Sequence, residues 1–185
     1  MTRIVAGAAG GRRLHVPARG TRPTSDRVRE AVFSALESRM DLDGARVLDL
    51  YAGSGALGLE ALSRGAAHAR FVESDRRAAT LLRRNATDLG LAAAVEVTTA
   101  TVRAVLRDRP AGSYDLVLAD PPYDLGDTEL ATVLAALAGN AWLTSGALLV
   151  IERAARDPAP SWPDDVAAVT ERRYGVTRVY YGYAL

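Results

Sequence analysis

The sequence contains no cysteine and no lysine, and it has only two histidines, His15 and His68. The absence of cysteine excludes a disulfide scaffold, a thiolate nucleophile, a cysteine-ligated zinc site and an iron–sulfur cluster. Two histidines are too few for a multi-histidine centre, so we expect no bound metal. No apolar run reaches the ~20 residues that span a bilayer, and the N-terminus lacks the pattern of a secretory signal. We therefore expect a cytoplasmic protein without membrane contact.

Positive charge is concentrated at the start of the chain. Of the 185 residues, 49% are hydrophobic and 24% are charged, which suits a single folded core. Residues 1–30 carry a net charge of +5 and the other 155 carry −4, which gives the chain its +1. The seven arginines of this segment are Arg3, Arg12, Arg13, Arg19, Arg22, Arg27 and Arg29. This segregation favours a polyanionic partner such as nucleic acid; a solvated arm without a partner fits the charge equally well.

The basic segment is predicted to form a short arm over residues 1–23, ahead of a main domain over residues 24–185. Alternating runs at residues 3–6 and 13–16 flank Gly10-Gly11 and predict a β-hairpin. Ser25 is a predicted N-cap, and the apolar residues that follow at helical spacing predict a helix over residues 26–39.

From residue 45 onward the pattern predicts a parallel α/β sheet. Strand-like apolar runs occur at residues 46–51, 69–73, 95–98, 114–119 and 147–152, and helical patterns at residues 56–64, 75–89, 102–107 and 128–138. Apolar strands alternating with helices indicate a doubly wound, Rossmann-like sheet that is buried on both faces. Residues 166–174 and 177–184 alternate around Gly175 and predict an antiparallel hairpin at one sheet edge.

A glycine-rich turn follows the first strand of this sheet. The turn consists of Tyr51, Ala52, Gly53, Ser54 and Gly55, and Gly58 completes the G-x-G-x-x-G pattern. In this pattern the first glycine permits the tight turn, the second lets a ligand approach the backbone and the third allows close helix packing. Glu73 ends the next strand, where an acid can accept hydrogen bonds from ribose hydroxyls. We predict that Glu73 and Ser74 contact the nucleoside part of a cofactor.

Asp49 distinguishes between two cofactors that fit such a turn. Its carboxylate lies at the tip of the first strand, four residues before Gly53. There it would repel a pyrophosphate, whereas it suits the ammonium group of a methionine moiety. S-adenosylmethionine carries that cation and no phosphate. Asp49 therefore favours S-adenosylmethionine over NAD, and a dehydrogenase is the weaker alternative.

A second motif, Asp120-Pro121-Pro122-Tyr123, follows the strand at residues 114–119. Two prolines cannot continue a central strand, so the chain must turn out at the carboxyl edge, where open α/β sheets bind ligands. Asp120 and the Pro121 carbonyl can accept both N–H groups of an exocyclic amine, and Tyr123 can stack on the base for ~1–3 kcal/mol. The nitrogen becomes acidic after methyl transfer, so it needs no tuned base. We predict that these four residues form the catalytic group.

The chain combines four informative segments: RPTSDRVRE at residues 22–30, YAGSGALGLEALSR at 51–64, VESD at 72–75 and DPPY at 120–123. Together they resemble the RsmD family, the bacterial 16S ribosomal RNA guanine-N2 methyltransferases. The resemblance implies a class I methyltransferase fold with a seven-stranded, mostly parallel sheet, and S-adenosylmethionine as cofactor. It also implies a target guanine in 16S ribosomal RNA, within the small subunit or an assembly intermediate, and an N-terminal arm that helps to hold RNA. We expect a monomer.

One position departs from related enzymes, which usually place Asp or Asn where this chain has Thr101. We predict that Thr101 accepts a hydrogen bond from the adenine amino group and that the Val102 N–H reaches the adenine ring. Two alternatives stay open for the function. Asp-Pro-Pro-Tyr also suits adenine N6 or cytosine N4 in a DNA amino-methyltransferase, and the chain could instead be a non-catalytic RNA-binding assembly factor.

Overall fold

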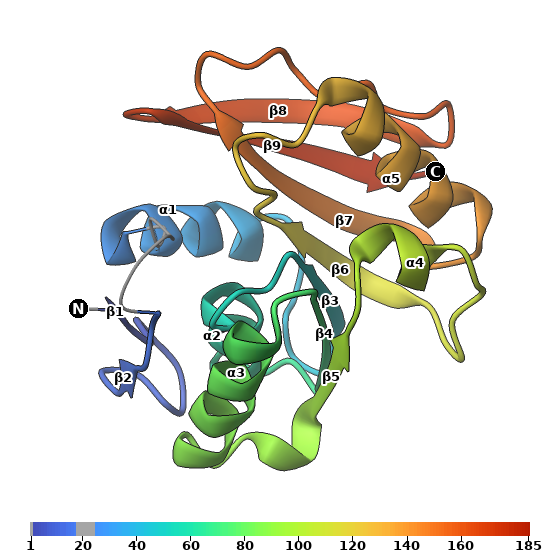
Figure 1. The fold of residues 1–185 in the computed structure, drawn as a ribbon. Coiled ribbons are helices and arrows are strands. Elements are labelled where there is room, and N and C mark those ends of the chain that lie inside the picture. The colour runs from blue at the N-terminus through green and yellow to red at the C-terminus, as the bar shows by residue number, and fades with distance from the viewer. Residues whose placement is uncertain (1, 18–24) are drawn as a thin grey trace.

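The computed structural model describes residues 2–17 and 25–185 (Figure 1). Two of the predicted RNA-binding arginines, Arg19 and Arg22, lie outside these residues. The helices are α1 (Asp26–Glu37), α2 (Ala56–Ser63), α3 (Arg76–Asp88), α4 (Val102–Leu106) and α5 (Asp127–Gly139), and Ala92–Ala94 form a short 3-10 helix, η1. The strands are β1 (Thr2–Arg3), β2 (Arg13–Leu14), β3 (Arg46–Leu50), β4 (His68–Glu73), β5 (Val95–Thr99), β6 (Tyr114–Ala119), β7 (Leu143–Ala154), β8 (Val166–Tyr174) and β9 (Thr177–Ala184).

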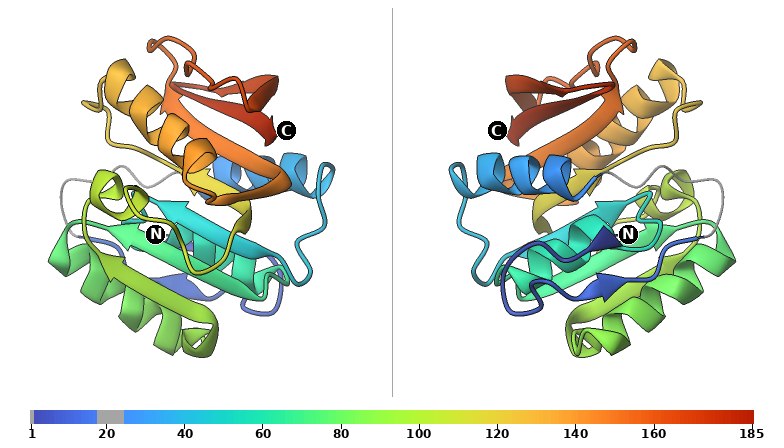
Figure 2. Two further views of the ribbon diagram at one scale, coloured as in Figure 1. Left: turned by 90° about the vertical axis from the view of Figure 1, so that its right-hand side faces the viewer. Right: turned by 90° about the vertical axis from the view of Figure 1, so that its left-hand side faces the viewer.

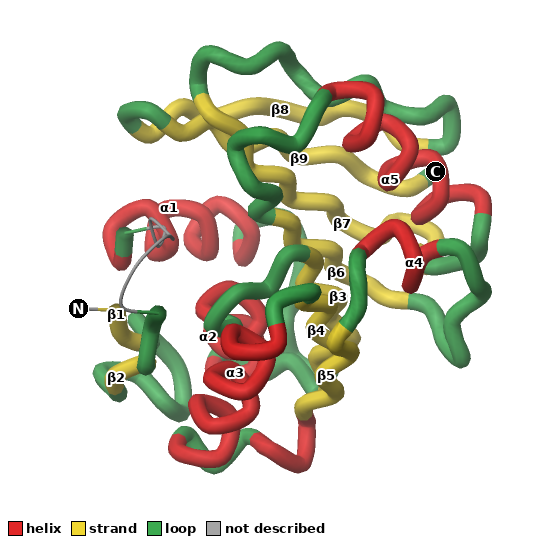
Figure 3. The backbone as a smooth tube through the Cα atoms, viewed as in Figure 1, coloured by secondary structure: helices red, strands yellow, loops and turns green. Residues whose placement is uncertain are grey.

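The main sheet has seven strands in the order β5-β4-β3-β6-β7-β9-β8 (Figures 1 and 3). Strands β3 to β7 are parallel, whereas β9 pairs antiparallel with both β7 and β8. The predicted mostly parallel sheet with a C-terminal antiparallel hairpin is therefore confirmed. The chain adds β4 and β5 on one side of β3 and β6 on the other, so the order reverses between β3 and β6. A crevice that binds ligands forms at such a reversal, beyond the carboxyl ends of the strands.

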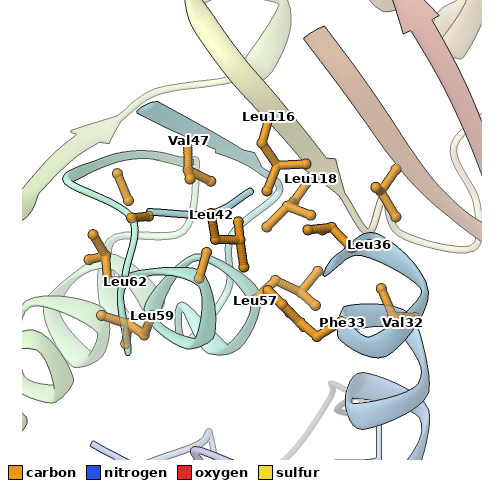
Figure 4. Close-up of a cluster of buried hydrophobic side chains, with 14 of the residues drawn as sticks. Val32, Phe33, Leu36, Leu42, Val47, Leu57, Leu59, Leu62, Leu116 and Leu118 are labelled. Carbon is orange, nitrogen blue, oxygen red and sulfur yellow. The ribbon is translucent and has the colours of Figure 1, made fainter. Parts of the chain in front are cut away.

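Helices cover both faces of this sheet (Figure 2). One buried cluster joins apolar residues of α1, α2 and α3 to one sheet face, and a second joins those of α4 and α5 to the opposite face. Figure 4 shows the first cluster, in which side chains of α1 and α2 converge on Leu116 and Leu118 of β6. Burial on both faces explains why the central strands are mostly apolar.

The boundaries of several predicted strands differ from the structure, most of all those of β7, β1 and β2. β7 is twelve residues long and extends beyond the predicted residues 147–152 at both ends. The N-terminal strands are only two residues each, shorter than the predicted runs 3–6 and 13–16. The reason is that the N–H groups of Val5 and Ala6 donate to the Glu60 carboxylate, at 2.8 and 3.0 Å, and not to a partner strand. Ser25 caps α1 as predicted, because its hydroxyl accepts the Val28 N–H at 3.3 Å.

The described part of the predicted arm is packed against the sheet domain. Ile4, Ala9 and Leu14 are buried in the cluster that contains α2 and α3. The backbone N–H of Ala9 also donates to the Ser63 hydroxyl of α2, at 2.9 Å. The boundary that we predicted at residue 23 falls outside the described residues. Of the helices in residues 2–17 and 25–185, none is both long and apolar enough to cross a membrane.

Candidate active site

The carboxyl ends of β3, β4 and β6 surround a cavity of about 580 Å³, within the ~300–1,000 Å³ typical of small-molecule sites. Most of the predicted site residues line it: Asp49, Tyr51, Ala52, Gly53, Ser54, Glu73, Ser74, Thr101, Val102, Asp120, Pro121, Pro122 and Tyr123. Gly55 is the one predicted cofactor residue outside this lining. The structure thus brings segments from four places in the chain to one cavity, and their roles in binding and catalysis stay predictions.

Asp49 lies at the floor of the cavity and is 1% exposed. Its Oδ2 accepts a hydrogen bond of 2.8 Å from the Gly58 N–H, at the start of α2. Burial raises the pKa of Asp49 well above its usual value; the Gly58 hydrogen bond lowers the pKa, and the charges of Asp120 and Glu73 raise it further. Asp49, Asp120 and Glu73 thus bring three carboxyl groups to the cavity; together they disfavour ionisation of Asp49 and the binding of an anion, whereas a bound cation would favour the ionised form.

Glu73 is held in place by two backbone N–H groups. Its Oε2 accepts a 2.7 Å hydrogen bond from Gly53, and its Oε1 accepts one of 2.7 Å from Asp75. Hydrogen bonds to an ionised acceptor are about twice as strong as neutral ones. Each carboxylate oxygen keeps a further acceptor position, so Glu73 can fix the glycine-rich turn and still accept from a ribose hydroxyl.

The three glycines of the turn have different roles. Gly53 has φ +55° and no atom lies within 4 Å of the position of an added Cβ, so this is where a ligand can approach the backbone. A Cβ on Gly58 would lie 2.3 Å from the Phe71 ring, which confirms the predicted close packing of α2 on the sheet. Gly55 was predicted to let a ligand approach, and this stays a prediction: Gly55 does not line the cavity, a Cβ there would meet Leu82 at 2.8 Å, and its φ is +85°. Gly55 serves packing and the turn, because the side of its backbone that would carry a Cβ faces the core.

Tyr51 occupies a backbone region that residues with a side chain rarely adopt, with φ +58°. Such outliers cluster at functional sites, because the surrounding structure must hold them in place. Burial, together with the nearby charge of Glu129, raises the pKa of Tyr51 to about 12. Its hydroxyl therefore stays protonated near neutral pH and is a hydrogen-bond donor in the cavity wall.

Thr101 caps the N-terminus of α4. Its hydroxyl oxygen accepts the Ala104 N–H at 3.2 Å. One acceptor position of the hydroxyl is therefore used within the protein, and one acceptor position and the proton remain. The prediction that Thr101 accepts from an adenine amino group fits that remaining position.

The Asp-Pro-Pro-Tyr segment turns away from the end of β6, as its prolines predicted. The Pro122 carbonyl accepts the Leu125 N–H at 2.9 Å and so closes a turn. That bond occupies the second of the two proline carbonyls, which supports the choice of the Pro121 carbonyl as the acceptor for an amine. The Tyr123 ring is 52% exposed, as stacking on a base requires.

A second cavity, of about 550 Å³, adjoins the same segment. It shares Asp120, Pro121 and Tyr123 with the first cavity and is otherwise lined by Ser25, Arg27, Val28, Glu152, Arg153, Tyr174, Gly175, Val176 and Thr177. These three shared residues line both spaces, and we call this segment the partition. A donor bound on one side and an acceptor bound on the other would meet at Asp120.

Sequence reasoning missed part of the first cavity's wall. Val16, Arg103, Leu125 and Glu129 also line it, and none belongs to a recognisable motif. Val16 comes from the N-terminal arm, whose position depends on the buried side chain of Asn85. The Asn85 amide donates to the carbonyls of His15 and Ser54, at 2.9 and 3.0 Å, and so joins the arm to the glycine-rich turn.

The predicted RNA-binding arginines do not all face the solvent. Arg3, Arg12 and Arg13 are exposed on the arm, and Arg27 is exposed at the start of α1. The prediction for Arg29 is wrong, because its guanidinium is fully buried. It lies 2.8 Å from Asp26 and 3.4 Å from Glu60, which is buried too. Arg29 therefore joins α1 to α2. Within residues 2–17 and 25–185, no three side chains gather that could hold a metal ion.

Solved structures share this architecture. The Escherichia coli protein yhhF superposes with a TM-score of 0.88 at 34% identity, covering 98% of this chain and 97% of that chain. The RNA methyltransferase from Salinibacter ruber in complex with S-adenosyl-L-homocysteine has a TM-score of 0.65 at 21% identity and covers 88% and 93%. At that identity the likeness concerns the fold alone. The expected class I methyltransferase fold is confirmed.

Sequence relatives agree with the structural ones. "Ribosomal RNA small subunit methyltransferase D" of Escherichia coli (strain K12) is 40% identical over 162 residues, which cover 87% of this chain and 79% of the relative. The protein of that name from Haemophilus influenzae is 33% identical over 177 residues, covering 94% and 89%. The family model described as Conserved hypothetical protein 95 matches residues 2–183. This chain belongs to that family, and the resemblance to the RsmD family that its motifs indicated is confirmed.

Proposed function

We propose that this chain transfers a methyl group from S-adenosylmethionine to the exocyclic N2 of a guanine in 16S ribosomal RNA. The observation that carries the proposal is the partition formed by Asp120, Pro121 and Tyr123, which lines both cavities. A transferase has to hold its donor and acceptor side by side with the reacting atoms close together, and residues that line both cavities can contact both. The names of the relatives, ribosomal RNA small subunit methyltransferases, support the choice of RNA as acceptor.

The residues of the first cavity fit S-adenosylmethionine. Asp49 gives the methionine ammonium group a buried carboxylate, and Glu73 gives the ribose an acceptor that two backbone hydrogen bonds fix in place. The negative floor of the cavity disfavours the pyrophosphate of a dinucleotide, so a dehydrogenase does not fit. When bound, S-adenosylmethionine supplies an electrophilic methyl group on a sulfonium centre.

Asp120 and the Pro121 carbonyl would act on the nitrogen of the acceptor. The exocyclic nitrogen of guanine is a poor nucleophile, because its lone pair is delocalised into the ring. Hydrogen bonds from its two N–H groups to Asp120 and Pro121 would hold the nitrogen and favour a pyramidal geometry. The new N–C bond would form as the bond between the methyl group and sulfur breaks, which leaves S-adenosylhomocysteine, and the nitrogen would then lose a proton to Asp120 or water. Tyr123 would stack on the base and hold it in the orientation that transfer requires.

The exposed arginines of the N-terminal arm would contact the phosphates of the RNA. Arg3, Arg12 and Arg13 lie on this arm, and Arg27 lies at the second cavity. Contacts of this kind position a nucleic acid without reading its sequence. We place the enzyme in the cytoplasm as a monomer that acts on the small subunit or an assembly intermediate.

Methyl transfer from labelled S-adenosylmethionine to three substrates tests this function: purified small ribosomal subunits, naked 16S RNA and duplex DNA. Label in RNA, recovered as N2-methylguanosine, is the expected result. Label on DNA alone would show that the chain is instead a DNA amino-methyltransferase. Binding of RNA with no label on any substrate would indicate a non-catalytic assembly factor.

A further inference from the structure

A second acidic residue, Glu152, lies near Asp120 in the second cavity. Parallel pairing of β6 with β7 sets Ala119 opposite Ile151; Asp120 directly follows β6, and Glu152 is the next residue on β7. Neighbouring strands lie ~4.8 Å apart, so the chain leaves β6 at Asp120 close to Glu152. Both line the second cavity, and Glu152 is only 4% exposed. The buried carboxylate of Glu152 therefore lies next to the partition, in the second cavity, where we place the acceptor base.

The two carboxyl groups line the same cavity, next to α1. Side chains alternate between faces along a strand, so Glu152 of β7 shares a face with Val150. Val150 belongs to the buried cluster that also contains residues of α1. The N-terminus of α1 supplies Ser25, Arg27 and Val28 to the second cavity. Asp120 and Glu152 are thus positioned to act together on one ligand between β6, β7 and α1.

The walls of the second cavity suit a flat ring. Tyr123 is 52% exposed and Val176, at the β8–β9 turn, is 58% exposed. They are two of the four large hydrophobic residues that are exposed in residues 2–17 and 25–185, and both line this cavity. An aromatic ring and an aliphatic side chain beside Asp120 and the buried Glu152 match the faces and the polar edge of a nucleobase.

We propose that Glu152 selects guanine by accepting a hydrogen bond from its N1–H while Asp120 holds the N2 amino group. On guanine these two donors are neighbours, and adjacent carboxylates on β6 and β7 supply matching acceptors. A purine with a lone pair at N1, such as adenine or 2-aminopurine, would set that lone pair against the Glu152 carboxylate. Sites that are built for a hydrogen bond reject analogues that lack the donor.

The neighbouring residue on β7 has a different role. Arg153 lies 2.6 Å from Asp127 and 3.6 Å from Asp157, and it donates to the Leu125 carbonyl at 3.0 Å. These contacts hold the loop between β6 and α5, so Arg153 serves the structure of the partition. Glu152 is therefore the residue of β7 that we assign to base selection. This assignment rests on the function proposed above.

The test compares two target bases and two enzymes. Small subunits are assembled from 16S RNA that carries either guanosine or 2-aminopurine at the methylated nucleotide. 2-Aminopurine keeps the N2 amine but has no N1–H. For the wild-type chain we expect kcat/KM to be at least about tenfold higher on guanosine, in line with ~1–3 kcal/mol for reading a base. In E152Q the amide can donate to N1 of 2-aminopurine, so we expect the preference to shrink at least about tenfold or to reverse.

Three results separate the inference from the function. Wild-type transfer to neither base would overturn both. Transfer to guanosine with an equal rate on 2-aminopurine would overturn the role of Glu152 and leave the function intact, and this result needs no variant. An unchanged preference in E152Q, with unfolding and S-adenosylhomocysteine affinity like those of the wild type, would also overturn it. The control E171Q changes an exposed carboxylate on β8 and should keep the wild-type preference.

Discussion

Glu73, at the end of β4, accepts a hydrogen bond of 2.7 Å from the backbone N–H of Gly53, in the turn after β3. The other carboxylate oxygen of Glu73 accepts the N–H of Asp75 at 2.7 Å. One side chain therefore fixes the glycine-rich turn relative to the next strand before any cofactor binds. Pre-ordering of this kind lowers the cost of binding, because the turn does not have to be ordered by the ligand.

Glu73→Gln should weaken the binding of S-adenosylhomocysteine by about 10- to 100-fold, the range for losing a hydrogen bond to a charged acceptor, ~1.5–3 kcal/mol. The amide group of Gln would also set a donor against one of the two backbone N–H groups, which loses that hydrogen bond. Isothermal titration calorimetry measures the change in affinity for S-adenosylhomocysteine. Glu96→Gln, which alters a half-exposed side chain on the neighbouring strand β5, is the control and should bind like the wild type. Equal affinity in the two variants would show that Glu73 does not support the cofactor site.

Asp49→Asn should stabilise the chain without cofactor and weaken cofactor binding. Burial raises the folded-state pKa of Asp49 above 3.8, opposed by the Gly58 hydrogen bond and reinforced by Asp120 and Glu73. The folded state then binds more protons than the unfolded state above that pH, so the Asp49 contribution to stability falls as pH rises from 3.8 to the folded pKa. Asn cannot ionise, and its side-chain oxygen still accepts the Gly58 N–H.

Urea unfolding of both proteins at several pH values checks this prediction. The stability advantage of Asp49→Asn should be largest near neutral pH and vanish below about pH 4. Calorimetry should show at least about tenfold weaker S-adenosylhomocysteine binding, because the ammonium group loses its carboxylate. A variant less stable than the wild type at neutral pH would contradict the electrostatic account of the cavity floor.

Gly58→Ala should destabilise the fold by ~1–3 kcal/mol, the usual cost of overpacking a core. The added methyl group would lie 2.3 Å from the Phe71 ring. Gly139→Ala is the matched control: it lies at the end of α5 with no atom within 4 Å, and it should be neutral or stabilising by up to ~1 kcal/mol. Chemical denaturation measures both. A neutral Gly58→Ala would mean that α2 can move away from the sheet.

The sequence predicted the sheet and its motifs because the signals are local. Apolar runs, the spacing of the glycines and the two prolines after Ala119 each determine backbone geometry within a few residues. Gly55 shows the limit of such signals. Its predicted role as a ligand contact depended on which side of its backbone faces the core, and a contact with Leu82, from a helix further along the chain, decides this.

Long-range contacts also explain the error at Arg29. The sequence shows a basic segment, whereas the structure buries one of its arginines between Asp26 and the buried Glu60 of α2. Glu60 lies on a mostly apolar helix, α2, and nothing in the sequence indicates which residues pair with it. Likewise, no motif predicted that β7 would place Glu152 beside Asp120, because their proximity follows from the pairing of the two strands.

Arg29→Met should lower the stability of the fold, whereas Arg13→Met should weaken the binding of RNA. Removal of Arg29 takes away its contacts with Asp26 and Glu60, while Arg64 still pairs with Glu60 at 2.9 Å, so we expect a loss of stability of ~1–3 kcal/mol. Arg13 is exposed, so its replacement should change stability by less than ~0.5 kcal/mol. It should instead weaken RNA binding and lower the log–log salt slope by about one unit. Thermal unfolding and RNA titrations over a range of salt concentrations measure these effects. A stable Arg29→Met chain with weakened RNA binding would contradict the structural role of Arg29.

Nucleoside analysis by mass spectrometry tests the central claim most directly, with small-subunit RNA from cells that lack this protein and re-express either the wild-type chain or Asp120→Ala. The account predicts N2-methylguanosine at one position with the wild type and none with Asp120→Ala, although both purified proteins bind S-adenosylhomocysteine with similar affinity. Methylation by Asp120→Ala at the normal level, or a wild-type product methylated at another atom, would contradict it.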